Sequence, residues 1–247
     1  MIGMKKFFVL SLPLILLLSA CATQPRSAIS DYDYSQMELV QLDAINGEIG
    51  ENDENRPIAI ITTSLGIIKI ALYPEYAPNT VANFIERVEE GFYDNTSVLA
   101  VQDGVFFAGL NSEGEAKTST GEPIENEYSV NMWPFRGAVG SYYGNTPGFG
   151  DSRFFIINEQ ELNVEQLEQL KEISVEYDED GEPLQMLPDE LIAAFEEVGC
   201  AVTLSGFFTI FGQTIEGIEI VEEITKSELD RQSRPTQEIE IVSIKIQ

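Results

Sequence analysis

The sequence contains no histidine, and only 2 of its 247 residues are cysteines. Without histidine, the chain cannot form a Ser-His-Asp triad, a Cys-His pair or a histidine-ligated metal site. These absences exclude most hydrolase mechanisms. We therefore expect no histidine-ligated metal ion in this protein.

Basic residues are also scarce, with 14 Lys and Arg against 42 Asp and Glu, a formal charge of -28 at pH 7. A surface of this charge repels phosphate backbones and anionic lipid headgroups, so nucleic acid is not an expected partner. By contrast, the hydrophobic residues amount to 43% of the chain, with 10% aromatics. This content can supply a packed core, and a folded domain is expected.

The N-terminus has the pattern of a secretory signal. Lys5 and Lys6 precede an apolar run over residues 7–18, which is too short to span a bilayer comfortably. We predict a signal peptide over residues 1–20. The Leu-Ser-Ala-Cys sequence that ends at Cys21 resembles the lipobox of bacterial lipoproteins, which implies acylation of this cysteine and an extracytoplasmic protein anchored to a bacterial cell membrane. The alternative is an ordinary cleaved signal followed by an incidental cysteine.

If Cys21 carries lipid, the second cysteine, Cys200, has no partner within the chain. An internal disulfide is then excluded. A nucleophilic thiol would need a base to activate it, and the chain has no histidine for this role. We predict that Cys200 is a small core residue.

The segment that follows Cys21 is polar and charged. Residues 21–56 are rich in Ser, Asp, Gln and Asn, and few apolar positions recur at helical spacing. We predict a lipidated cysteine followed by a flexible tether, with a short helix over residues 37–45 as the alternative.

The ordered domain is expected over residues 57–247. Two β-branched runs, at residues 58–63 and 67–72, are separated by Leu65-Gly66 and predict a hairpin. A helix should follow, because apolar residues recur on one face from Val81 to Val88. Asn79 or Thr80 can cap this helix, and Gly91 suits a left-handed residue after its end.

Residues 98–109 form two apolar arms around Asp103-Gly104. This dipeptide tolerates the positive φ angles of a tight turn, so a hairpin or sharp bend is predicted. The arms carry no charge and offer only Gln102 as a polar side chain between the turn and the strand ends.

Motifs from Leu65 onward resemble, in the same order, those of the cyclophilin family of peptidyl-prolyl isomerases. The matching segments are residues 65–72, 77–84, 91–96, 136–139, 152–156, 204–212 and 217–221. The resemblance implies a mainly β fold, namely a closed eight-stranded antiparallel barrel capped by two helices. The alternating run at residues 237–246 should be the closing strand.

Residues 158–202 replace a connection that is short in compact cyclophilins. Apolar residues recur at near-helical spacing over 162–173 and again over 191–198, so a helical insert with two helices is predicted. The acidic run at 178–182 superficially resembles a calcium loop. It lacks the twelve-residue register with a terminal bidentate Glu, and we interpret it as a solvated turn.

The resemblance also implies a site for prolyl isomerisation. This reaction crosses a barrier near ~20 kcal/mol and needs no cofactor, only an apolar pocket and a donor to the prolyl nitrogen. The family's arginine falls on Ala100, its glutamine on Ala108 and its histidine on Phe208. The pocket positions fall on Val105, Phe106, Phe155, Thr203, Leu204 and Phe208, and only Phe155 and Leu204 keep the family's residue type.

Two functions remain open. In the first, the protein binds peptides or proline segments of exported polypeptides and has weak or no isomerase activity. In the second, it is an active isomerase in which Arg153 replaces the missing arginine from a neighbouring strand; the alternative for Arg153 is pairing with a carboxylate. The aromatic residues of the stretch 133–149 either anchor peptides at the surface or pack in the core. They are Trp133, Phe135, Tyr142, Tyr143 and Phe149.

Overall fold

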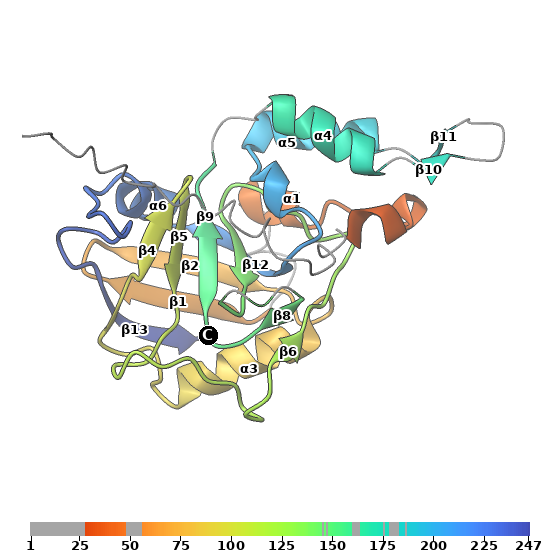
Figure 1. The fold of residues 1–247 in the computed structure, drawn as a ribbon. Coiled ribbons are helices and arrows are strands. Elements are labelled where there is room, and N and C mark those ends of the chain that lie inside the picture. The colour runs from red at the N-terminus through yellow and green to blue at the C-terminus, as the bar shows by residue number, and fades with distance from the viewer. Residues whose placement is uncertain are drawn as a thin grey trace, which may run out of the picture.

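The computed structural model describes residues 28–47, 56–144, 146, 148–159, 164–174, 176–177, 183–185 and 187–247. The expected signal peptide, Cys21 and the acidic run at 178–182 lie outside the described residues. The described chain is mainly β, with one strongly curled antiparallel sheet and a few helices around it (Figure 1).

The main sheet has nine strands in the order β3-β13-β1-β2-β12-β7-β9-β5-β4. Their bounds are β1 Ile58–Thr63, β2 Ile67–Leu72, β3 Thr96–Ser97, β4 Ala100–Gln102, β5 Val105–Ala108, β7 Ala138–Ser141, β9 Phe154–Ile157, β12 Thr209–Glu216 and β13 Glu240–Ile246. Two short ladders stand apart, β6 Ile124–Glu125 with β8 Phe149–Gly150, and β10 Glu176–Tyr177 with β11 Pro183–Gln185. The predicted hairpin of β1 and β2 is confirmed.

The sheet curls until its two edges meet on one stretch of chain. The edge strand β3 pairs with β13, the other edge strand β4 pairs with β5, and only Val98 and Leu99 separate β3 from β4. The curl is therefore closed by chain continuity and not by a ladder between these two strands. The closed eight-stranded barrel that we expected is not confirmed.

Two helices pack against the buried cluster that the curled sheet encloses. These are α3, Pro78–Glu89, and α6, Ile218–Thr225. The apolar faces of the helices and the inward side chains of the strands form one buried cluster. It includes Phe84 and Val221 from the helices, and Phe106, Phe154 and Phe211 from the strands. None of the helices within the described residues is long and apolar enough to cross a membrane.

The N-terminus of α3 is capped from a distant loop. The N-cap residue, Ala77, has no capping side chain, and the expected caps Asn79 and Thr80 lie inside the helix. Instead, the Glu127 carboxylate accepts hydrogen bonds from the backbone N–H groups of Asn79 at 2.9 Å and Thr80 at 2.8 Å. It also accepts from both of their side chains. Gly91, at φ +68°, is left-handed as predicted.

Replacing Glu127 with alanine should lower the free energy of unfolding by about 1–2 kcal/mol, because two backbone donors at the start of α3 lose their acceptor. Urea denaturation followed by circular dichroism measures this effect. Glu125→Ala is the matched control, since Glu125 is exposed and lies two residues away on β6. Equal midpoints for the two variants would show that the cap does not contribute.

A second hydrophobic cluster lies outside the sheet and includes the insert. Its helices are α4, Val164–Ser174, and α5, Asp189–Val198, which confirms the two predicted helices. The buried members of this cluster are Ile29, Trp133, Phe135, Leu167, Leu187, Leu191, Ala194, Phe195, Cys200 and Val202. Burial also raises the pKa of the Cys200 thiol, so this cysteine is a protonated core residue.

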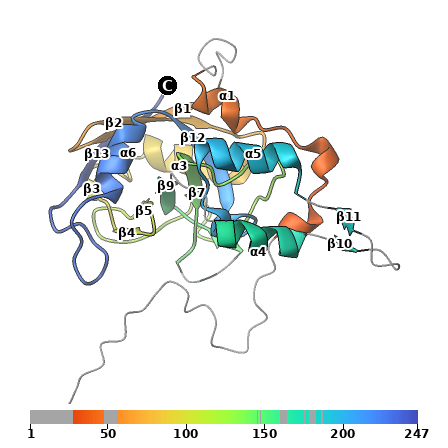
Figure 2. The same cartoon turned by 90° about the horizontal axis from the view of Figure 1, so that it is seen from above.

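Residues 28–46 pack on the domain, which differs from the flexible tether that we expected. They form the 3-10 helices η1, Ala28–Asp31, and η2, Tyr34–Gln36, followed by the α-helix α1, Gln41–Ile45. Figure 2 shows this segment, coloured red to orange, running past α5 toward α4. Its apolar residues are spread over three short helices, so they lack the long helical period that reveals an amphipathic helix.

Candidate functional site

The hairpin of β4 and β5 decides which side chains face outward. Asp103 and Gly104 form its turn with φ angles of 48° and 74°, as predicted. In the ladder, Ala100 lies opposite Phe107 and Val101 lies opposite Phe106. Because opposed residues share a face and neighbours alternate, Ala100 and Phe107 face outward while Val101 and Phe106 face the interior.

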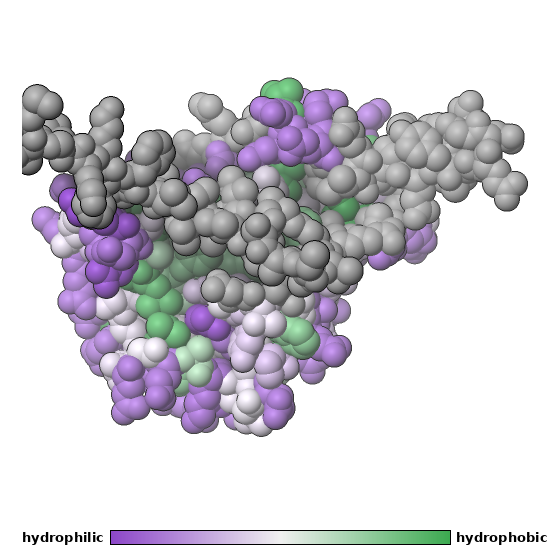
Figure 3. Space-filling model, viewed as in Figure 1, coloured by the Kyte–Doolittle hydropathy of each residue, from purple (hydrophilic) through white to green (hydrophobic). Residues whose placement is uncertain are grey.

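Four aromatic rings gather on this outer side of the sheet. The Phe107 ring centroid lies 5.3 Å from that of Tyr142 and 5.9 Å from that of Phe155, and the Phe155 centroid lies 5.4 Å from that of Phe208. We call Phe107, Tyr142, Phe155 and Phe208 the aromatic face. Figure 3 shows apolar side chains gathered on the side of the molecule formed by β4, β5 and β9.

The aromatic face rests on a rigid base. Phe155 is 1% exposed, and its ring lies directly over Gly140 of β7, its partner in the ladder. A Cβ atom added at Gly140 would lie 2.1 Å from Phe155 Cζ. The other three rings of the face are partly exposed, so a ligand can contact them.

Most of the predicted pocket residues lie together. Val105, Phe155, Leu204 and Phe208 belong to one hydrophobic cluster on the outer side of the sheet. Thr203 is exposed and lies beside them on the 3-10 helix η3, Val202–Leu204.

Phe106 does not belong to this set, which corrects our prediction. It is 2% exposed inside the curled sheet, where Ala108 is also buried, because both alternate with the outward positions of β5. The residue that reasoning from the motif missed is Phe107. The period-two alternation of the strand from Val105 onward is the signal that identifies it.

Arg153 is held at the edge of the aromatic face by Asp151. Its Nε and Nη2 donate to Asp151 Oδ1 at 3.0 Å and Oδ2 at 2.6 Å, and its backbone N donates to Oδ1 at 2.8 Å. The Asp151 side chain is 3% exposed. The guanidinium also lies 5.0 Å from the Tyr142 ring centroid and 5.6 Å from that of Tyr143.

The electrostatics of this corner keep Arg153 charged and Tyr142 neutral. Burial lowers the pKa of Arg153, but the hydrogen bond and the charge of Asp151 raise it, and the pKa lies above its ordinary value. Burial raises the pKa of Tyr142 to about 12. The guanidinium is therefore a permanent cation whose Nε and Nη2 are committed to one carboxylate.

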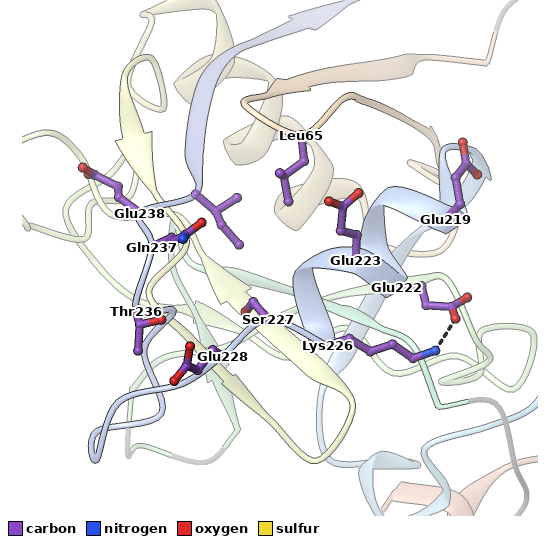
Figure 4. A pocket seen from close by; sticks show the side chains of 11 residues that line it. Leu65, Glu219, Glu222, Glu223, Lys226, Ser227, Glu228, Thr236, Gln237 and Glu238 are labelled. Atoms are coloured by element: carbon purple, nitrogen blue, oxygen red, sulfur yellow. Dashed lines mark hydrogen bonds and ion pairs between the residues drawn. The ribbon is translucent and has the colours of Figure 1, made fainter.

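Among the cavities within the described residues, two help to place the candidate site. One of about 250 Å³ borders the aromatic face and is lined by Lys117, Thr118, Tyr143, Asp151 and Arg153, among others. The other, of about 710 Å³, lies between α6 and residues 226–239 (Figure 4). Five of its eleven lining residues are glutamates, and one of these, Glu222, is paired with Lys226. No predicted site residue borders this second cavity, so we locate the candidate site at the aromatic face.

Comparisons with known proteins identify the family of the chain. A family model described as cyclophilin type peptidyl-prolyl cis-trans isomerase/CLD matches residues 58–246. A Staphylococcus saprophyticus protein, named for an inferred peptidyl-prolyl cis-trans isomerase activity, is 29% identical over 205 residues, which cover 82% of this chain and 96% of that protein. A similarly named Staphylococcus epidermidis protein is 27% identical over 206 residues, with the same coverage.

A solved structure shares the fold. The crystal structure of a Cryptosporidium parvum cyclophilin type peptidyl-prolyl cis-trans isomerase, determined in the presence of the dipeptide Ala-Pro, superposes with a TM-score of 0.54 at 21% identity. The match covers 77% of this chain and 98% of that one. The curled sheet and its helices therefore have the arrangement found in that protein.

Proposed function

Because the chain belongs to the cyclophilin-type peptidyl-prolyl cis-trans isomerase family, we propose that it binds proline-containing segments of exported polypeptides and has weak or no isomerase activity. The observation that carries this proposal is the aromatic face. Its rings are in place, whereas the position of the family's arginine holds Ala100 on the same outer side.

Binding and catalysis make different demands on such a site. A proline ring needs an apolar surface to pack on, and the partly exposed Phe107 and Phe208 rings, which lie on either side of the buried Phe155, offer one. Rotation about the amide bond also needs a fixed donor that localises the lone pair of the prolyl nitrogen in a water-poor pocket. Ala100 offers no such donor, so the face favours binding over turnover.

We further propose that the curled sheet is a closed barrel, in which residues 96–102 join its two edges.

Titration calorimetry tests the binding. A short peptide with one Xaa-Pro bond should bind in a saturable manner, and the same peptide with Pro replaced by Ala should bind at least about tenfold more weakly, because it cannot fill the apolar surface. Phe208→Ala, a partly exposed position of the face, should weaken binding of the proline peptide. Equal heats for the two peptides would contradict the proposal.

The second candidate function is an active isomerase that uses Arg153. One observation favours it: the guanidinium lies 5.0 Å from the ring of Tyr142, which itself contacts Phe107 of the aromatic face. A donor could therefore approach the face from this side. Against it, Asp151 already accepts from Arg153 Nε and Nη2.

Under our proposal, a proline-limited refolding reaction should proceed at the same rate with the Arg153→Ala variant as with the wild-type protein. Arg234→Ala is the matched control, because Arg234 is an exposed arginine that pairs with Asp230 on the loop before β13. If the wild type and Arg234→Ala are active and Arg153→Ala is not, the second candidate function is correct.

We also propose that the protein is extracytoplasmic and held at a bacterial cell membrane by acylated Cys21, with the segment from Cys21 to residue 56 joining it to the domain. The support is the sequence pattern at residues 5–21. Growth with labelled palmitate should label the protein and not its Cys21→Ser variant. An unlabelled wild-type protein would exclude the anchor.

A further inference from the structure

The short helix η3 lies where two hydrophobic clusters meet. Val202, at its start, is buried in the second cluster with Trp133 and Phe195. Leu204, at its end, belongs to the outer-side cluster with Phe155 and Phe208. The three residues of η3 therefore connect the second cluster to the aromatic face.

The N-terminal segment is built into the domain by a buried polar network. Gln41, which is 0% exposed, accepts from the Trp133 backbone N at 2.6 Å and donates to the Trp133 backbone O at 2.9 Å. It also donates to Gln213 Oε1 at 3.0 Å on β12. Each of these hydrogen bonds joins residues at least 92 positions apart in the chain, so they fix the segment to the body of the protein.

Aromatic contacts extend this connection to the insert. The Tyr34 ring stacks on Trp133 with centroids 6.4 Å apart, and Tyr32 meets the same indole edge-on at 5.8 Å. Trp133 in turn contacts Phe195 of α5 at 5.7 Å. Helix α4 packs against both η1 and η3, so the N-terminal segment, the insert and η3 form one packed unit.

We propose that residues 28–46, which we call the strap, are a positioning element that holds η3 and thereby the part of the peptide site formed by Leu204 and Phe208. The strap contacts Trp133 and α4. Trp133 shares the second cluster with Val202, and α4 packs against η3. Ala44 of the strap is also buried in the outer-side cluster, against which Leu204 and Phe208 pack. The effect on peptide binding rests on the proposed function, whereas the effect on η3 does not.

Hydrogen–deuterium exchange on the whole mature chain tests the strap. The reporters are the amides of Leu204 and Ser205, which donate to Ala201 O at 2.9 Å and Val202 O at 3.1 Å. In Gln41→Ala, these amides should exchange at least about tenfold faster while those of β1 and β2 keep their rates, because local opening is decoupled from global unfolding. Gln36→Ala, an exposed strap glutamine, is the control. Tyr34→Ala keeps the Gln41 hydrogen bonds, and it replaces Gln41→Ala in this test if Gln41→Ala folds poorly.

Calorimetry on the same variants supplies the functional readout. Gln41→Ala and Tyr34→Ala should weaken binding of the proline peptide by about three- to tenfold, because part of the binding energy is spent on ordering η3. Faster exchange throughout the domain, or unchanged exchange at η3, would contradict the proposal that the strap positions η3. If exchange at η3 changes locally in the variants but the wild-type protein binds no proline peptide, the strap proposal stands and the proposed function is refuted.

Discussion

An Ala100→Arg variant should isomerise Xaa-Pro bonds at least about tenfold faster than the wild-type protein, because one fixed donor is typically worth a factor of 10² to 10³ in such a site. In the proposed function, Ala100 is the position where the donor is missing, and it lies opposite Phe107 on the outer side of the sheet. We expect less than the full factor, since Phe208 and not histidine stands on the far side of the face.

Proline-limited refolding of a denatured substrate measures this gain. Val242→Arg is the matched control, because it adds the same charge on an exposed position of β13 that is 39% accessible. We expect acceleration by Ala100→Arg alone. If both arginine variants bind peptide and neither accelerates refolding, the site differs from a cyclophilin site in more than its donor.

A Gly140→Ala variant should lose most of its peptide binding, with a dissociation constant at least about tenfold weaker, because overpacking of this kind costs about 1–3 kcal/mol and forces the ring to move. The added methyl group would lie 2.1 Å from Phe155 Cζ. The ring cannot shift freely, because Phe107 and Phe208 pack beside it. The change therefore displaces the centre of the aromatic face.

Gly212→Ala separates this effect from a loss of stability. Its Cβ would lie 2.8 Å from Ile70 Cγ2, which is buried inside the sheet and not on the aromatic face. Both variants should lower the thermal midpoint, and only Gly140→Ala should weaken peptide binding measured by calorimetry below that midpoint. Equal binding by the two variants would place the peptide site elsewhere.

Local patterns made much of the fold predictable. The β-branched runs of β1 and β2, the positive φ angles at Asp103 and Gly104, and the helical spacing in the insert were all confirmed. Each of these signals depends on residues that are neighbours in the chain. The order of the family motifs predicted a mainly β fold with an antiparallel sheet, which is confirmed, and a closed eight-stranded barrel, which is not.

Features that depend on distant partners were not predictable in this way. The Glu127 cap joins residues 47 and 48 positions apart, and nothing near Glu127 in the sequence marks it as a helix cap. Likewise, the strap is held by Gln41 through contacts with Trp133 and Gln213, which a polar segment does not reveal. Phe106 was placed in the pocket because a motif was carried over by position, without the alternation that turns Phe107 outward.

The most direct test of the account is to measure binding and turnover on one preparation of the wild-type protein. Calorimetry with a proline peptide should show saturable binding, and proline-limited refolding with the same protein concentration should proceed at, or only slightly above, the spontaneous rate. Binding without turnover is the predicted result. Turnover that Arg153→Ala abolishes would contradict the account and identify an active isomerase.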